Sequence, residues 1–126
     1  MEKIHESYED YLKAIFLISK THKGGWVTNS EISNFLNIKP SSVSNMLHNL
    51  AKKGYIDWKP RKSIRMTKKG KRIASNTINN YNSLVKFFSN VLKLKNDALI
   101  DKISCEIEHH INSEISNALE GLFSDF

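Results

Sequence analysis

Two short helical segments joined by a tight turn constrain the fold of this 126-residue chain more than any other feature. In VTNSEISNFL, Thr28 and Glu31 have the spacing of a capping box, which predicts the start of a helix. After the turn at residues 37–39, Pro40 suits the first position of another helix. The apolar residues of that helix recur at helical spacing: Val43, Met46, Leu47 and Leu50. Two short helices connected in this way form a helix-turn-helix.

The segment that follows, GYIDWKPRKSIRMT, predicts a β-hairpin. Residues 55–59 would form the outgoing strand, residues 60–62 the turn and residues 63–67 the returning strand. A hairpin directly after the second helix of a helix-turn-helix is a wing. Together with an amphipathic helix over about residues 7–20, it predicts a winged helix-turn-helix domain over residues 1–67.

Positive charge is concentrated around this hairpin. The chain has a net charge of +6, and ten Lys and Arg residues lie between Lys52 and Arg72 against a single acid, Asp57. Such a surface suits a polyanion, and the short polar side chains of the preceding helix suit base edges and phosphates. The sequence therefore predicts binding of double-stranded DNA, with a protein partner or a merely solvated basic face as alternatives. The candidate DNA-binding residues are Lys39, Ser41, Ser42, Ser44, Asn45, His48, Lys52, Lys59, Arg61, Lys62 and Arg65.

Residues 68–126 predict a second, helical domain. Thr67 is placed to cap a helix through KKGKRIASNTINNYNSLVKFFSNVLKL, which would be about 40 Å long. Asn96 is placed to cap a further helix, and NSEISNALEGLF has the pattern of a last amphipathic helix. Groove-reading modules commonly act as two-fold pairs on two half-sites, so this lobe favours a homodimer. The expected fold is mainly α, with a winged helix-turn-helix DNA-binding domain and a helical dimerisation domain.

The sequence carries no sign of export or membrane insertion. No stretch approaches about 18 consecutive apolar residues, and the N-terminus, MEKIHESYEDY, is charged where a signal peptide would be apolar. We therefore expect no membrane association and a cytoplasmic location.

The stretch CEIEHH contains the single cysteine of the chain and a set of candidate metal ligands. On a helix, Cys105, Glu108 and His109 stand at i, i+3 and i+4 and project from one side. That side lies away from the isoleucine stripe of the same segment, so it need not be buried. Thiolate, carboxylate and imidazole together can bind a borderline-soft divalent metal and leave room for a fourth ligand. An ordinary polar helix face would give the same pattern, so the spacing by itself leaves both interpretations open.

Four motifs follow one another along the chain: SYEDYLKAIF, KPSSVSNMLHNLAKKGYI, RMTKKGKRIA and CEIEHH. Over nearly its full length, the sequence resembles the short, two-domain form of the diphtheria toxin repressor and manganese transport regulator family. The resemblance implies a dimeric repressor of metal-uptake genes that binds operator DNA when Fe(II) or Mn(II) occupies sites between its first, fourth and fifth helices. Because the sequence ends at Phe126, the SH3-like domain of the longer members is expected to be absent.

By this resemblance, the family's principal metal site falls on Asp10, Cys105, Glu108 and His109. The first-helix ligand is Asp in the manganese type, whereas the position of Cys105 is Cys in the iron type, so this sequence is a hybrid. Fe(II) or Mn(II) is therefore the expected cofactor. The thiolate would also accept Zn(II) or Co(II) in vitro.

Two departures from the family pattern affect a second metal position. Lys13 stands where many manganese-type members carry a glutamate, and Tyr81 stands where a histidine is expected. We therefore expect one metal per subunit, with the Lys13 ammonium supplying the charge of the missing ion. A solvated helix lysine is the alternative for Lys13.

Two rival functions can be stated from the same residues. A winged-helix regulator that is not controlled by metal would leave the CEIEHH stretch without a ligand role. A catalytic zinc site, with Glu108 as the base, would make the protein an enzyme. No oxyanion donors or substrate pocket can be inferred from the sequence and the basic head would be unexplained, so we expect that the protein is not an enzyme.

Overall fold

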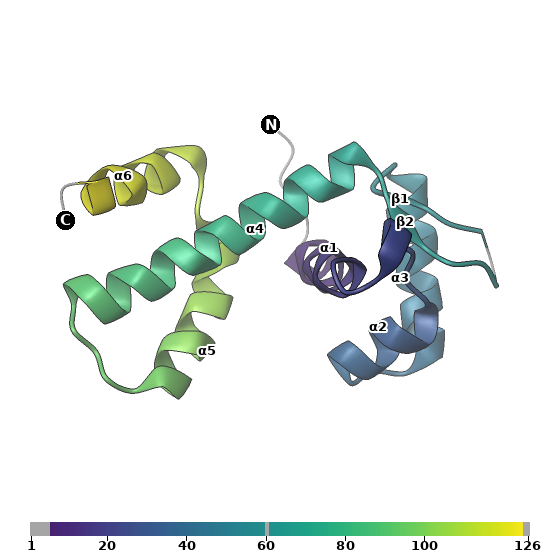
Figure 1. Ribbon diagram of the computed structural model, residues 1–126, viewed down its shortest axis with the longest axis horizontal. Helices are drawn as coiled ribbons and strands as arrows, with labels where there is room; N and C mark the ends of the chain where they lie inside the picture. Colours follow the sequence, from purple (N-terminus) through teal and green to yellow (C-terminus); the bar gives the residue numbers. More distant parts are fainter. Residues whose placement is uncertain (1–5, 60, 125–126) are drawn as a thin grey trace. The chain divides into compact units, whose positions relative to one another are not determined.

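The computed structural model describes residues 6–59 and 61–124, and Figure 1 shows their arrangement as helices with one small hairpin. The chain divides into two compact units, Met1–Ser75 and Asn76–Phe126. The expectation of a mainly α fold is confirmed. Among the described residues, no helix combines the length and the apolar character needed to cross a membrane.

The first unit is a small helical bundle with a hairpin attached. Apolar residues of α1, α2 and α3 and of the hairpin form one buried core, in which Leu12, Ile32 and Leu47 are fully buried. The helical spacing of these side chains gives each helix one apolar face, and burying the three faces together holds the bundle closed. The elements of this unit are α1 Glu6–Ser19, a 3₁₀ turn at Lys23–Gly25, α2 Asn29–Leu36, α3 Pro40–Lys52, β1 Ile56–Asp57, β2 Arg65–Met66 and the start of α4 at Lys68.

The capping box expected at the start of α2 is present. The Thr28 hydroxyl accepts a hydrogen bond from the Glu31 amide at 3.2 Å, and the Glu31 carboxylate accepts one from the Thr28 amide at 3.0 Å. Pro40 also occupies the first turn of α3, as its fixed φ favours. These local signals fix where both helices of the helix-turn-helix begin.

Replacing Thr28 with alanine is expected to reduce the free energy of unfolding by about 1 kcal/mol, because the α2 amides lose their side-chain acceptor. Urea denaturation of the variant and of the native protein would measure the difference. Ser30→Ala is the matched control, since Ser30 is an exposed residue in the same turn that caps nothing. Equal stability of all three proteins would contradict a stabilising role for the cap.

The predicted hairpin is confirmed, but its paired strands are shorter than expected. Within the described part of the hairpin, the antiparallel ladder pairs Ile56 with Met66 and Asp57 with Arg65. Beyond that ladder, Ile64 bridges to Val27, the residue before the α2 cap, through hydrogen bonds of 2.7 and 2.9 Å. The returning strand is therefore paired partly outside the hairpin, which hydrophobic alternation within 55–67 could not indicate. Pro60, in the predicted turn, lies outside the described residues.

The second unit contains the rest of α4 and the elements that follow it. The expected single long helix ends earlier as an α-helix than the sequence suggested. After Lys86 the hydrogen bonding changes to a π-helical turn, with the Leu92 amide donating to the Phe87 carbonyl, and Lys93 then adopts a positive φ of 59°. The expected Asn96 cap is present and accepts from the Leu99 amide at 3.1 Å. The elements are α4 Lys68–Lys86, the π turn Phe87–Val91, α5 Asp97–Ile107, a 3₁₀ turn at Glu108–His110 and α6 Ser113–Ser124.

Candidate metal centre and nucleic-acid interface

The outer face of α3 carries most of the predicted base-reading residues. Ser41, Ser42, Asn45 and His48 are exposed on this face, and Lys39 and Lys52 are exposed at its two ends. Short donors and acceptors on an exposed helix of a helix-turn-helix are suited to the edges of bases in a major groove.

Ser44 differs from the other polar residues of α3, because it is half-buried and already bonded. Its hydroxyl accepts a hydrogen bond from the Asn29 amide nitrogen at 2.9 Å, which ties the first turn of α2 to α3. Sequence reasoning missed Asn29, since an asparagine early in a helix gives no sign of a partner fifteen residues away. Ser44 therefore fixes the position of α3 against α2, in addition to its predicted role in contacting DNA.

The predicted phosphate-binding residues of the hairpin, Lys59, Arg61, Lys62 and Arg65, are all exposed. The Arg65 guanidinium lies over the ring of Trp26 at 5.4 Å from its centroid, a cation–π contact that restrains the arginine. On the outgoing side, Trp58 packs edge-on against His48 of α3, with ring centroids 4.7 Å apart. These ring contacts connect the charged hairpin to the segment before α2 and to α3.

Within the second unit, the predicted metal ligands lie where α5 changes to a 3₁₀ turn. Cys105 is in the last turn of α5, and Glu108 and His109 begin the 3₁₀ turn. Glu108 is only 2% exposed and the His109 side chain 4% exposed, whereas Cys105 is half-buried. The expectation that this face need not be buried is therefore corrected for Glu108, whose side chain is almost inaccessible to solvent. Asp10, the predicted fourth ligand, is an exposed residue of α1 in the first unit.

A buried carboxylate needs a positive or hydrogen-bonding partner, because removing its charge from water is costly. The Glu108 oxygen Oε1 lies 3.7 Å from Nε2 of His109, and both side chains are almost inaccessible to solvent. Carboxylate oxygen and imidazole nitrogen are donors that fit Fe(II), Mn(II) or Zn(II), whereas the structure does not gather the Cys105 sulfur with them as a ligand group. The residues present on this part of the chain therefore fit a divalent transition metal.

Tyr81 of α4, which stands where the family pattern leads one to expect a histidine, is engaged by Asp101 of α5. Its hydroxyl donates a hydrogen bond to the Asp101 carboxylate. That bond, together with burial and the negative charge of Asp101, raises the pKa of Tyr81 to about 12. At neutral pH the phenol keeps its proton, which makes the oxygen a poor metal ligand.

Replacing Asp101 with asparagine is expected to lower the pKa of Tyr81 from about 12 toward its ordinary value of 10. The raised pKa favours the neutral phenol in the folded state. Its contribution to stability is therefore present below about pH 10 and is lost as the pH rises toward 12. Ultraviolet absorbance of tyrosinate against pH would measure the shift, with Tyr81→Phe identifying the signal. An unchanged titration in the Asp101 variant would show that another group holds the proton.

Comparisons with known proteins assign both halves of the chain. Residues 3–64 match the family model for the iron dependent repressor, N-terminal DNA binding domain, and residues 67–126 match that for the iron dependent repressor, metal binding and dimerisation domain. An uncharacterised HTH-type transcriptional regulator of Methanocaldococcus jannaschii is 31% identical over 121 residues, which cover 96% of this chain and 95% of the relative.

Two further matches agree with this assignment. The HTH-type transcriptional regulator MntR of Oceanobacillus iheyensis is 28% identical over 106 residues, covering 84% of this chain and 69% of MntR. The crystal structure of T. acidophilum IdeR superposes with a TM-score of 0.74 at 26% identity, covering 98% of this chain and 56% of that one. This chain thus spans little more than half of the IdeR structure. The resemblance inferred from the sequence motifs is confirmed: the chain belongs to the iron dependent repressor family of metal-dependent, DNA-binding transcriptional regulators, which are not enzymes.

Proposed function

We propose that this protein is a homodimeric repressor of metal-uptake genes that binds its operator when Fe(II) or Mn(II) is held by Asp10, Cys105, Glu108 and His109. The observation that carries the proposal is the burial of the Glu108 carboxylate beside the His109 imidazole. A carboxylate and an imidazole side by side are donors that a divalent transition metal binds. The family match of residues 67–126 to a metal binding and dimerisation domain supports the same assignment.

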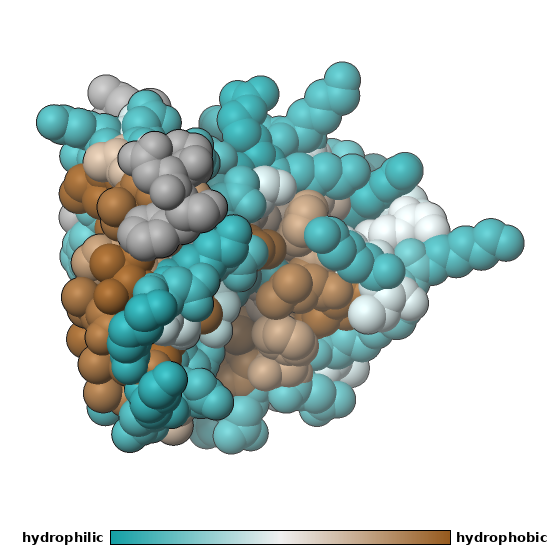
Figure 2. Space-filling model, turned by 60° about the vertical axis from the view of Figure 1, so that its left-hand side comes forward, coloured by the Kyte–Doolittle hydropathy of each residue, from teal (hydrophilic) through white to brown (hydrophobic). Residues whose placement is uncertain are grey.

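Exposed apolar side chains of the second unit support the homodimer. Large hydrophobic residues normally leave water when a partner is available, and a contiguous exposed group of them is typical of an interface. Figure 2 shows hydrophobic side chains gathered on part of the surface. Among the residues of the second unit whose exposure the structure describes, the exposed large hydrophobic ones are Leu92, Leu94, Leu99 and Ile115.

In the proposed mechanism, the metal acts by joining a ligand of α1 to ligands of the second unit. Asp10 belongs to the DNA-binding head, whereas Glu108 and His109 belong to the dimerisation lobe. A metal held by both would favour those conformations in which the two α3 helices of the dimer match successive major grooves. Only its differential affinity for these conformations contributes, and allosteric couplings are typically about 1–3 kcal/mol.

The proposal includes one metal per subunit. Tyr81 is committed to Asp101, which supports the loss of a second metal position, and Lys13 would contribute a fixed positive charge in its place. Metal analysis of the protein after gel filtration would give the stoichiometry. Two tightly bound ions per subunit in this region would contradict it.

Fluorescence anisotropy of labelled DNA would test the function directly. The DNA would come from upstream of the protein's own gene, at fixed moderate salt, first in chelator and then with anaerobic Fe(II), with Mn(II) or with Zn(II). We expect the affinity to rise by about tenfold or more with the effector metal. If a fragment shown to contain the operator binds equally in every condition, the protein is a winged-helix regulator without metal control.

A further inference from the structure

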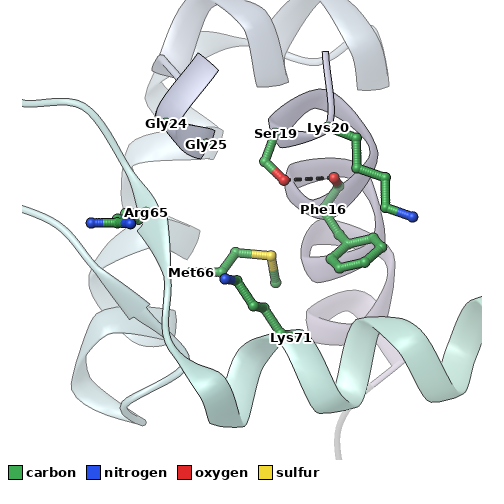
Figure 3. A pocket seen from close by; sticks show the side chains of 8 residues that line it. All are labelled: Phe16, Ser19, Lys20, Gly24, Gly25, Arg65, Met66 and Lys71. Atoms are coloured by element: carbon green, nitrogen blue, oxygen red, sulfur yellow. Dashed lines mark hydrogen bonds between the residues drawn. The ribbon is translucent and has the colours of Figure 1, made fainter. Parts of the chain in front are cut away.

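A cavity of about 370 Å³ lies within the first unit, between the end of α1, the following 3₁₀ turn, β2 and the first turn of α4. Its size falls within the range of small-molecule sites, which begins at roughly 300 Å³. Figure 3 shows Phe16 and Met66 facing one another across it, with the Lys71 ammonium ending beside Met66. Lys20 and Arg65 also line the cavity, but their charged ends point away from the space between Phe16 and Met66.

The charge of this cavity is entirely positive. Its lining includes Lys20, Arg65 and Lys71 and no acid. Within the described part of the chain, none of the three pairs with a carboxylate: Lys20 lies over the Phe16 ring at 4.5 Å and Arg65 over the Trp26 ring at 5.4 Å. Contacts with ring faces leave N–H groups of both side chains available to an acceptor.

The position of Lys71 adds a second, independent argument. The N-terminal end of a helix carries partial positive charge, which favours anions and disfavours cations. The first turn of α4 nevertheless contains three lysines and no acid. The Lys69 ammonium donates a hydrogen bond to the Lys53 carbonyl at 3.2 Å and lies over the Tyr55 ring, and both contacts stabilise its charge. Among the described residues, no group makes such a contact with the Lys71 ammonium. An anion in the cavity would relieve this repulsion.

We propose that this cavity binds a small organic phosphate, with its phosphate near Lys71 and its apolar body between Phe16 and Met66. The lining contains three cations and no acid, which favours an anion, and the Lys71 ammonium is the charged group that ends beside Met66. The apolar walls favour a ligand with a hydrophobic part, which a DNA backbone phosphate does not offer. The proposal goes beyond the function above and uses residues of the first unit only.

The first test is an NMR titration of the ¹⁵N-labelled full-length protein with phenyl phosphate, inorganic phosphate and sodium chloride at constant ionic strength. We expect saturable shifts of the Gly24, Gly25 and Met66 amides with both phosphates. Phenyl phosphate should bind about fivefold more tightly, because its ring is removed from water. Shifts that do not saturate, or that chloride reproduces, would overturn a specific free-ligand site.

Variants of the α4 lysines distinguish binding at this cavity from a general attraction of anions to the basic surface. Lys71→Gln should weaken phenyl phosphate binding by about tenfold or more, because a charge-assisted hydrogen bond is lost. Lys71→Arg should restore most of the affinity. Lys68→Gln is the matched control, because Lys68 is in the same turn but does not line the cavity. Equal loss in the Lys68 and Lys71 variants would overturn the proposal.

The salt dependence of DNA binding distinguishes the source of the phosphate. If a backbone phosphate occupies the cavity, Lys71→Gln should reduce the slope of log K against log salt by about 0.9, and the Lys68 control should not. An unchanged slope together with saturable phenyl phosphate binding would identify a free molecule as the ligand. The absence of both effects would show that the cavity binds no phosphate.

Discussion

The Gly70→Ala variant is expected to unfold about 10 °C below the native protein, or not to fold at all at physiological temperature. A Cβ atom at this position would lie 2.1 Å from the carbonyl oxygen of Tyr55. The Cβ atom is bonded to the backbone and the oxygen is part of it, so no side-chain rotation relieves the clash. We expect the free energy of unfolding to fall by about 3 kcal/mol, at the upper end of overpacking effects. Calorimetry of both proteins would measure it.

The clash is costly because the surrounding contacts resist a shift of α4. The Thr67 amide donates to the Tyr55 carbonyl at 3.1 Å, and the Thr67 hydroxyl donates to the Gly54 carbonyl at 2.7 Å. Moving α4 outward would stretch these bonds. Gly121→Ala is the control, since its Cβ would meet nothing within 4 Å in the middle of α6, and a small gain in stability is expected there. Equal melting temperatures for Gly70→Ala and the native protein would show that α4 accommodates the methyl group without strain.

The His109→Ala variant is expected to lose the metal response of DNA binding completely. The affinity gain of about tenfold or more that the effector metal gives the native protein should be absent. The proposed function predicts this loss because the imidazole is a ligand that no neighbouring side chain replaces. Weak, salt-sensitive DNA binding should persist, since the basic residues of the first unit are unchanged. Anisotropy titrations with and without the effector metal would measure both quantities.

His110→Ala provides the matched control, because His110 is an exposed imidazole adjacent in the chain. It should retain the metal response. Asp10→Ala should behave like His109→Ala while keeping its circular dichroism spectrum and its melting temperature in chelator. A metal response that survives in both ligand variants would refute the ligand set, and loss of folding in both would show that these residues are structural.

The helix starts of this fold could be predicted because they depend on neighbours in sequence. Thr28 with Glu31, Pro40 and Asn96 correctly marked the starts of α2, α3 and α5. The end of α4 could not be predicted, because nothing in the apolar spacing around Phe87 signals a π turn. The length of the hairpin strands was also beyond local patterns, since Ile64 pairs with a distant residue.

For the candidate site, sequence could name residue types but not their burial. The burial of Glu108 depends on packing in the folded chain, which the spacing of residues along α5 does not indicate. The bond between Asn29 and Ser44 likewise depends on how two helices meet. The clash predicted at Gly70 is a tertiary effect as well, because Tyr55 approaches from a separate turn.

The two legs of the hairpin are attached to different parts of the helix-turn-helix. The returning leg is held through Ile64 to Val27, immediately before α2, while the outgoing leg meets α3 through the contact of Trp58 with His48. Any rotation of α3 relative to α2 would therefore pull one leg more than the other and swing the tip sideways. A change in the angle between α2 and α3 would therefore also shift the exposed positive charges of the hairpin.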